Sequence, residues 1–192
     1  MTRYSSDISD EELMQKASQG DRLAFAAIYD RWSERIFRFF RKMLWQNDDV
    51  AADFTQDLFL KIAERPGAFN PQYRFSTWVY TLASNMCKNE YRKQSIRHHV
   101  NADDSGVSRT VADTGYESPE RMVDSVNFEH KLQQTLGTLS EEHRTVFVLR
   151  YKEELSLKEI ADITQVSEGT VKSRLFYALK KISEQVKDFQ FD

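Results

Sequence analysis

The sequence of 192 residues is poor in features that would place it outside a reducing compartment or within a membrane. Cys87 is its only cysteine, which excludes an internal disulfide and a cysteine-rich zinc site. The longest apolar run, Leu23 to Tyr29, is far shorter than the roughly 20 residues that a membrane-spanning helix needs. The N-terminus has no apolar stretch typical of a secretory signal. These absences favour a cytoplasmic protein without direct membrane insertion.

Motifs for catalysis and cofactor binding are also missing. The six glycines are too widely spaced for a dinucleotide fingerprint or a phosphate-binding loop. The four histidines show no metal-binding spacing, and no cluster of catalytic side chains stands out. We therefore expect no enzymatic activity, no cofactor and no metal site. Cys87 is expected to be a buried, inert thiol, with a redox role as the alternative.

Charge alternates along the chain, although the net charge is only −3. Residues 31–47 carry five basic and one acidic residue, and residues 66–100 have the same balance. Residues 101–130 carry seven acidic and two basic residues, a net charge of −5. Because the net charge averages over these blocks, the local pattern says more about binding partners than the isoelectric point does.

A linker is predicted between two helical parts. Residues 96–125 are rich in Asn, Asp, Ser and Gly and show no helical or strand period. On both sides, apolar residues recur at intervals of three and four, which predicts helices. We therefore expect an all-α protein with two small helical domains, residues 1–95 and 126–192, joined by a flexible acidic linker.

Helix-start signals support the helical interpretation. Ser9 with Glu12, and Ser156 with Glu159, fit the capping box, in which two side chains satisfy the free N–H groups at a helix start. Asp21 is a further N-cap candidate.

The segment SLKEIADITQVSEGTVKSRLFYALKKI, residues 156–182, predicts a helix-turn-helix. Its first helix would end near Thr164, with a turn at Gln165 and Val166 and a second helix capped by Ser167. The second helix of such a motif enters the major groove of DNA. An ordinary amphipathic helix pair with a solvated basic face is the alternative. The side chains expected to contact DNA are Ser167, Thr170, Lys172, Ser173, Arg174, Phe176 and Tyr177.

A second candidate nucleic-acid segment, residues 73–94, combines aromatic and basic side chains. Separated DNA strands need aromatic faces for unstacked bases and cations for the backbone. A flipped base also needs a polar group to read its edge, and Asn85 offers both a donor and an acceptor. For Trp78 a place in the core is the competing interpretation. The candidate contacts are Arg74, Trp78, Tyr80, Asn85, Lys88, Arg92 and Lys93.

Together these segments resemble bacterial sigma factors of the extracytoplasmic-function (ECF) type. Residues 136–182 resemble their promoter-reading domain, and residues 73–94 resemble the region that melts and reads the minus-ten element. The segment DVAADFTQDLFLKIAER, residues 49–65, resembles the helix that docks on the clamp helices of RNA polymerase. A surface helix with solvated acids is the other interpretation of this segment. The matching residues are Asp53, Gln56, Asp57, Phe59 and Leu60.

One residue departs from the family pattern. Gln165 stands in the turn where the family usually has glycine. If this position needs a left-handed backbone, a residue other than glycine costs about 1 kcal/mol. We expect the fold to tolerate this cost.

The resemblance implies a sigma factor that binds core RNA polymerase and directs promoter-specific transcription initiation. The N-terminal domain would capture the melted strand of the minus-ten element, and the C-terminal helix-turn-helix would read the minus-thirty-five element in duplex promoter DNA. The family further implies an anti-sigma factor as partner, with the chain monomeric when free or in a 1:1 complex. The central part of this linker, residues 96–121, is a connector of about 25 residues that could reach about 80 Å when extended. The alternatives are a self-sufficient dimeric helix-turn-helix regulator and an adaptor that titrates inhibitors of sigma factors.

Overall fold

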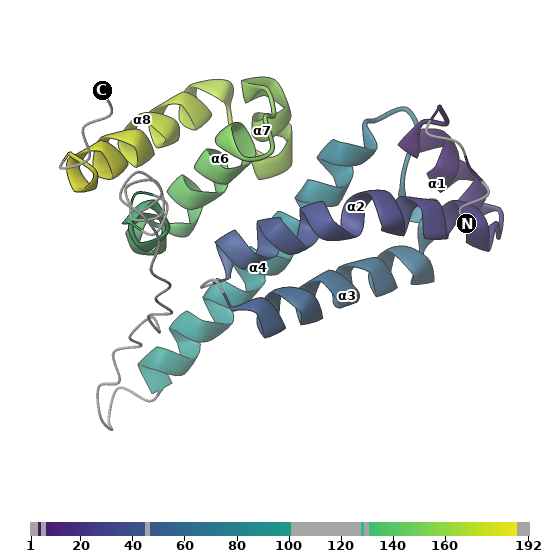
Figure 1. The fold of residues 1–192 in the computed structure, drawn as a ribbon, viewed down its shortest axis with the longest axis horizontal. Coiled ribbons are helices and arrows are strands. Elements are labelled where there is room, and N and C mark those ends of the chain that lie inside the picture. Colours follow the sequence, from purple (N-terminus) through teal and green to yellow (C-terminus); the bar gives the residue numbers. More distant parts are fainter. Residues whose placement is uncertain (1–3, 5–6, 45–46, 101–127, 129–130, 188–192) are drawn as a thin grey trace, which may run out of the picture.

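The computed structural model describes residues 4, 7–44, 47–100, 128 and 131–187. These residues form helices and connecting turns, without a strand, which confirms the all-α prediction (Figure 1). Residues 131–138 form a helix that precedes α6. The other elements are α1 (Asp10–Ser18), α2 (Arg22–Met43), α3 (Asp48–Glu64), η1 (Pro66–Ala68), α4 (Phe75–Val100), α6 (Glu141–Tyr151), α7 (Leu157–Thr164) and α8 (Glu168–Gln185). No helix of this described part is long and apolar enough to cross a membrane.

The predicted helix starts are confirmed. The hydroxyls of Ser9 and Ser156 accept hydrogen bonds from the backbone N–H groups of Glu12 and Glu159, and both capping boxes are complete. The Asp21 carboxylate accepts bonds from two N–H groups in the first turn of α2. Each such cap stabilises its helix by about 1 kcal/mol. The local sequence therefore defines where these three helices begin.

Helix α4 is longer than the sequence pattern predicts. It continues to Val100, so residues 96–100, which were assigned to the linker from their polar composition, are helical. No proline interrupts the chain between residues 72 and 118, so nothing in this stretch forces the helix to stop. The remaining residues of the predicted linker, 101–125, lie outside the described residues.

The N-terminal half is built around α2, which lies against α1 and α3 and also contacts α4 (Figure 1). Its buried face carries large aromatic side chains. The Phe39 and Tyr80 rings pack edge-on with centroids 5.4 Å apart, and the Trp32 and Phe75 rings do so at 5.3 Å. Such pairs add about 0.5–1.5 kcal/mol beyond the area that they bury. This packing holds α4 firmly on α2.

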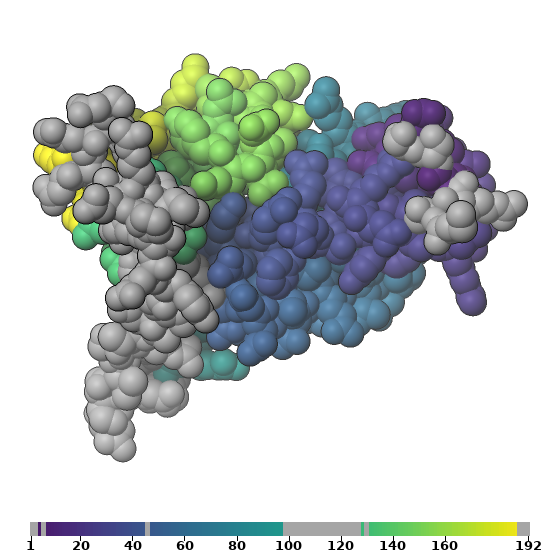
Figure 2. All heavy atoms as spheres, in the orientation of Figure 1, coloured from purple at the N-terminus to yellow at the C-terminus, as the bar shows by residue number. Residues whose placement is uncertain are grey.

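The C-terminal half packs directly against the N-terminal half. Apolar side chains of α6, α7 and α8, among them Val148, Ile160 and Val171, belong to the same buried cluster as the side chains of α2 and α4. Figure 2 shows the C-terminal half, in green and yellow, lying against the blue helices. A separate small cluster joins residues 131–138 to α6 and α8. The sequence predicts the two halves but not this contact between them.

Candidate nucleic-acid and protein interfaces

The helix-turn-helix has the predicted geometry. Helix α7 ends at Thr164, and Gln165 follows with φ 56° and ψ 43°, in the left-handed region. The N–H groups of Gln165 and Val166 both donate to the carbonyl of Ala161. Ser167 then caps α8 by accepting a bond from the Thr170 N–H. The turn therefore uses the left-handed backbone that favours glycine, and Gln165 carries the expected strain of about 1 kcal/mol.

The outer face of α8 is open to solvent. Its two aromatic side chains, Phe176 and Tyr177, are 63% and 58% exposed. Thr170 and Arg174 are half-buried, while Ser167, Lys172 and Ser173 are exposed. The buried face, with Val171 and Leu175, packs on the rest of the C-terminal half. The predicted contact residues thus form one accessible face, with hydroxyl, basic and aromatic groups.

The structure divides the candidate residues of the 73–94 segment into two groups. The polar and basic members are exposed: Arg74, Asn85, Lys88, Arg92 and Lys93. The two aromatic members lie inside the protein. The Trp78 ring is half-buried and packs against the Phe69 ring at 5.3 Å, and Tyr80 is fully buried. In this arrangement the basic side chains are available to DNA and the Tyr80 ring is not.

Helix α3 presents a mixed polar and apolar surface. Asp53, Gln56, Asp57 and Leu60 follow one another at helical intervals and are exposed, with Leu60 51% exposed. Phe59 points the other way, and its ring packs edge-on against that of Tyr29 at 4.9 Å. An apolar side chain among acids and an amide suits a protein interface steered by charge.

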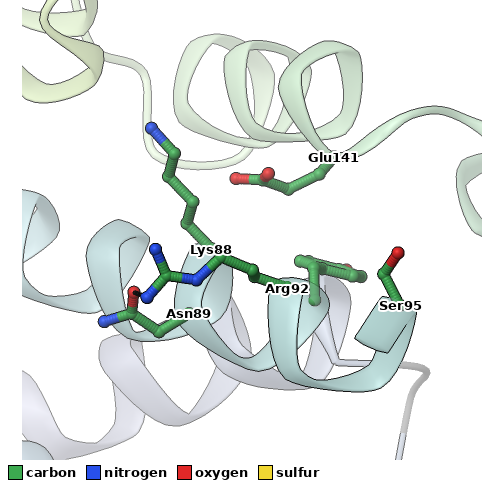
Figure 3. Close-up of a pocket in the computed structure, with 6 residues that line it drawn as sticks. Lys88, Asn89, Arg92, Ser95 and Glu141 are labelled. Atoms are coloured by element: carbon green, nitrogen blue, oxygen red, sulfur yellow. Dashed lines mark hydrogen bonds between the residues drawn. The ribbon is translucent and has the colours of Figure 1, made fainter. Parts of the chain in front are cut away.

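Two adjoining pockets lie between α4 and the C-terminal half. The first, of about 330 Å³, is lined by Lys88, Asn89, Arg92 and Ser95 of α4 and by Glu141 at the start of α6, and the Lys88 side chain extends toward the C-terminal half (Figure 3). Burial, and secondarily the charge of Glu142, raises the pKa of the Glu141 carboxyl, while Lys88 and Arg174 act in the opposite direction. The second pocket, of about 240 Å³, is lined by Asn85 and Lys88 of α4 and by Arg174 of α8. Residues of both candidate DNA surfaces therefore meet in one place.

A buried polar cluster joins the two halves. The Tyr80 hydroxyl donates a hydrogen bond to the carboxylate of Glu153, which follows α6 and is 8% exposed. A guanidinium nitrogen of Arg35 lies 3.8 Å from the same carboxylate. Burial, with the nearby charge of Glu153, raises the pKa of the Tyr80 phenol, so this group remains a hydrogen-bond donor.

A second buried cluster surrounds Arg144 of α6, which is 4% exposed. One of its terminal nitrogens donates to the Met43 carbonyl at 3.0 Å and to the Tyr91 hydroxyl at 2.8 Å, both in the N-terminal half. The other donates to the carbonyls of Gly137 and Leu139 at 2.9 and 3.2 Å. The Tyr91 hydroxyl also donates to the Met43 carbonyl. Sequence reasoning missed Arg144 and Glu153, since no local pattern marks either residue.

Cys87 lies fully buried on α4. Burial, and then the charge of Glu141, raises the pKa of its thiol. A raised pKa disfavours the reactive thiolate. These properties agree with an inert structural thiol. Among the described residues no group of His, Cys, Asp and Glu side chains is placed to hold a metal ion.

Comparison with known proteins gives one family match in each half of the chain. Residues 28–96 match the Sigma-70 region 2 family, and residues 135–184 match the Sigma-70, region 4 family. The ECF RNA polymerase sigma factor SigW of Bacillus subtilis is 32% identical over 181 residues, which cover 91% of this chain and 95% of SigW. The RNA polymerase sigma-H factor of Pseudomonas aeruginosa is 31% identical over 179 residues, which cover 91% of this chain and 92% of the sigma-H factor.

Solved structures show the same fold. CnrH, in complex with the cytosolic domain of CnrY, matches with a TM-score of 0.70 and 21% identity over 94% of this chain and 99% of CnrH. The sigma factor RpoE, in complex with the anti-sigma factor NepR from Bartonella quintana, matches with a TM-score of 0.68 and 20% identity. The match covers 85% of this chain and 96% of RpoE.

Proposed function

The chain belongs to the ECF RNA polymerase sigma factors. On this basis we propose which surface of the chain binds the polymerase and which surfaces bind each promoter element. As a sigma factor, it binds core RNA polymerase and directs transcription initiation from specific promoters. The alternative of a self-sufficient dimeric regulator finds no support, because the relatives that align over nearly their whole length are sigma factors.

The minus-thirty-five element is read by α8. An N-capped helix with an open polar and basic face is the form in which a helix-turn-helix enters the major groove. Lys172 and Arg174 supply positive charge for phosphates, and the hydroxyls of Thr170 and Ser173 can bond to phosphate or base edges. The exposed rings of Phe176 and Tyr177 can make apolar contact with the methyl group of thymine in the major groove.

The minus-ten element is read by the exposed side of α4. Asn85 is placed to read the edge of a flipped base, and Lys88, Arg92 and Lys93 are placed to bind the backbone of a melted strand. Arg74 lies at the start of the same helix. Trp78 contributes by supporting the helix through its packing on Phe69.

Core RNA polymerase is bound by the exposed side of α3. The support is the spacing of Asp53, Gln56, Asp57 and Leu60 on one face, together with the exposed apolar surface of Leu60. The buried Phe59 holds α3 on α2 through Tyr29 instead of touching the polymerase.

The functional units of the chain are residues 1–100, to the end of α4, and 126–192, with residues 101–125 as the connector between them. The structural relatives CnrH and RpoE were solved with a protein bound, which for RpoE is an anti-sigma factor. We extend this to the present chain and propose an anti-sigma factor as its partner. The chain acts in the cytoplasm, as an initiation factor without catalytic activity of its own.

One observation gives this proposal its main support. The chain matches both region 2 and region 4 of the Sigma-70 family, and its alignment covers 95% of SigW. It is tested by binding a labelled promoter library to the free chain, to core polymerase and to the mixture. Two weak DNA-binding surfaces gain avidity only when the polymerase holds both at the spacing of the promoter elements. We therefore expect the mixture of chain and polymerase to retain specific promoters and the free chain not to retain them. Tight specific binding by the free chain would contradict the proposal.

A further inference from the structure

Helix α4, which carries the proposed minus-ten surface, begins at a residue that cannot cap it. Arg74 holds the N-cap position, because its carbonyl accepts a bond from the Trp78 N–H at 3.2 Å and α4 starts with the next residue. Side-chain oxygens of Asp, Asn, Ser or Thr usually satisfy the free N–H groups from this position. A guanidinium group has no acceptor, so Arg74 cannot do so. The start of α4 therefore needs an acceptor from another part of the chain.

Helix α1 supplies this acceptor. A carboxylate oxygen of Glu11 accepts a hydrogen bond from the Phe75 N–H at 2.8 Å, although the two residues are 64 positions apart. Phe75 is the first residue of α4, so the bond satisfies one of its free N–H groups. The carboxylate also lies at the positive end of the helix dipole, where negative charge is stabilising. Glu11 thus acts as an N-terminal cap that comes from a different helix.

The Glu11 carboxylate is presented by a firmly packed helix. The neighbouring Asp10 accepts hydrogen bonds from the Arg31 guanidinium and from the Trp32 indole N–H of α2, both at 2.8 Å. On the other side of α1, Leu13 is fully buried. Helix α1 also contacts η1, the short helix that precedes α4. Because α1 is fixed on α2, its carboxylate can determine where α4 begins.

The bond holds the part of α4 that bears a candidate DNA contact. The Arg74 side chain directly precedes Phe75 and is 76% exposed. On the inner side, the Phe75 ring packs edge-on against the Phe69 ring at a centroid distance of 5.7 Å, and Phe69 also packs against Trp78. Fraying of the first turn would therefore release Arg74 and disturb this aromatic packing at the same time.

We propose that Glu11 is a positioning residue for recognition of the minus-ten element. It caps α4 from α1 and so fixes the first turn of the helix, together with Arg74, for contact with the melted strand. The inference rests on the proposed function, since it names what positions the same DNA-binding surface. Glu11 acts through α4 and not by touching DNA, because a carboxylate and a phosphate repel each other. Helix α1, to which no polymerase or promoter contact is assigned, gains a role in promoter melting.

The test compares two substitutions of the same residue. Glu11→Ala removes the acceptor, whereas the amide oxygen of Glu11→Gln can accept the same bond. Glu12→Ala is the matched control, because Glu12 belongs to the capping box of α1 and its loss loosens α1 without removing the cap of α4. With core polymerase and a promoter, permanganate reactivity of the minus-ten thymines measures melting, and fluorescence anisotropy measures the affinity for core polymerase. Amide hydrogen exchange of the free chain, followed by NMR, measures the protection of the Phe75 N–H.

We expect about a fivefold loss of melted promoter in Glu11→Ala, as for the removal of one helix cap, with unchanged affinity for core polymerase. The Phe75 N–H should exchange faster in this variant. Glu11→Gln should retain most of the melting and of the protection, and Glu12→Ala should melt the promoter as the wild type does.

Equal melting by Glu11→Ala and the wild type would overturn the proposal, and so would unchanged exchange at Phe75. An equal loss in Glu11→Gln would show that the hydrogen bond is not the cause, and an equal loss in Glu12→Ala would reduce the effect to a general loosening of α1. Either result contradicts the inference. If the wild-type chain with core polymerase melts no promoter, the proposed function has failed and this inference falls with it.

Discussion

The Tyr80 hydroxyl donates a hydrogen bond to Glu153, a residue 73 positions further along the chain and on the opposite side of the interface between the halves. Both groups are buried, and Arg35 of α2 lies beside the acceptor. A buried carboxylate needs such partners, because an unpaired charge in the protein interior is costly. The bond therefore ties the position of the C-terminal half, which carries the helix-turn-helix, to the N-terminal half.

Replacing this acceptor should loosen the packing between the two halves. In Glu153→Ala the buried Tyr80 hydroxyl loses its partner, which costs the packed arrangement of the two halves about 1–3 kcal/mol. We expect a larger radius of gyration in small-angle X-ray scattering and a lower midpoint of thermal unfolding. Glu154→Ala, at the next, exposed residue of the same loop, is the matched control and should leave both unchanged. Equal scattering from the Glu153 variant and the wild type would count against the fastening role.

The turn of the helix-turn-helix offers a stabilising substitution. Gln165 has φ 56°, and glycine adopts this conformation without the steric penalty, so Gln165→Gly should raise the free energy of unfolding by about 0.5–1 kcal/mol. Urea denaturation measures the change. Lys180→Gly, in the middle of α8, is the control and should lower the free energy of unfolding by a similar amount. A destabilised Gln165→Gly chain would show that the glutamine side chain contributes more than the backbone strain costs.

The recognition helix should bind DNA phosphates through Lys172. With the chain in complex with core polymerase, Lys172→Ala should weaken promoter binding across sequences and reduce the salt dependence of binding by about one unit of log–log slope. Filter binding over a range of salt concentrations measures both. Lys187→Ala, beyond the end of α8, is the control. An unchanged slope for Lys172→Ala would remove this residue from the interface.

The exposed side of α3 should contribute to polymerase affinity through Leu60. About half of this side chain remains to be buried, so Leu60→Ala should weaken binding of core polymerase by about fivefold, from the loss of roughly 1 kcal/mol of apolar burial. Fluorescence anisotropy of the labelled chain measures the affinity. Leu23→Ala, at a similarly exposed leucine of α2, controls for loss of apolar surface. If both variants bind alike, α3 does not form the proposed contact.

Local signals predicted much of the fold. The caps at Ser156 and Ser167 and the turn at Gln165 are interactions within a few residues, so the sequence around them predicts their geometry. The apolar stripes also predicted the helices, because packing on a core requires one apolar face. These features position α8 as the family resemblance implies.

Contacts between distant segments were not predictable. Arg144 reaches a carbonyl 101 residues earlier in the chain, and neither composition nor periodicity marks such a partner. For the same reason the burial of Tyr80 and Phe59, both expected at binding surfaces, became visible only with the packing of α2 against α4 and α3. Residue type suggested a function for these aromatic rings, and tertiary packing decides whether they are accessible.

Promoter-specific initiation is the central claim, and reconstituted run-off transcription tests it most directly. Purified chain and purified core RNA polymerase are incubated with a library of promoter fragments, with core polymerase alone as the reference. The account predicts defined transcripts from a subset of fragments only when the chain is present. Identical transcript patterns with and without the chain, under conditions where a known sigma factor activates the same core, would contradict it.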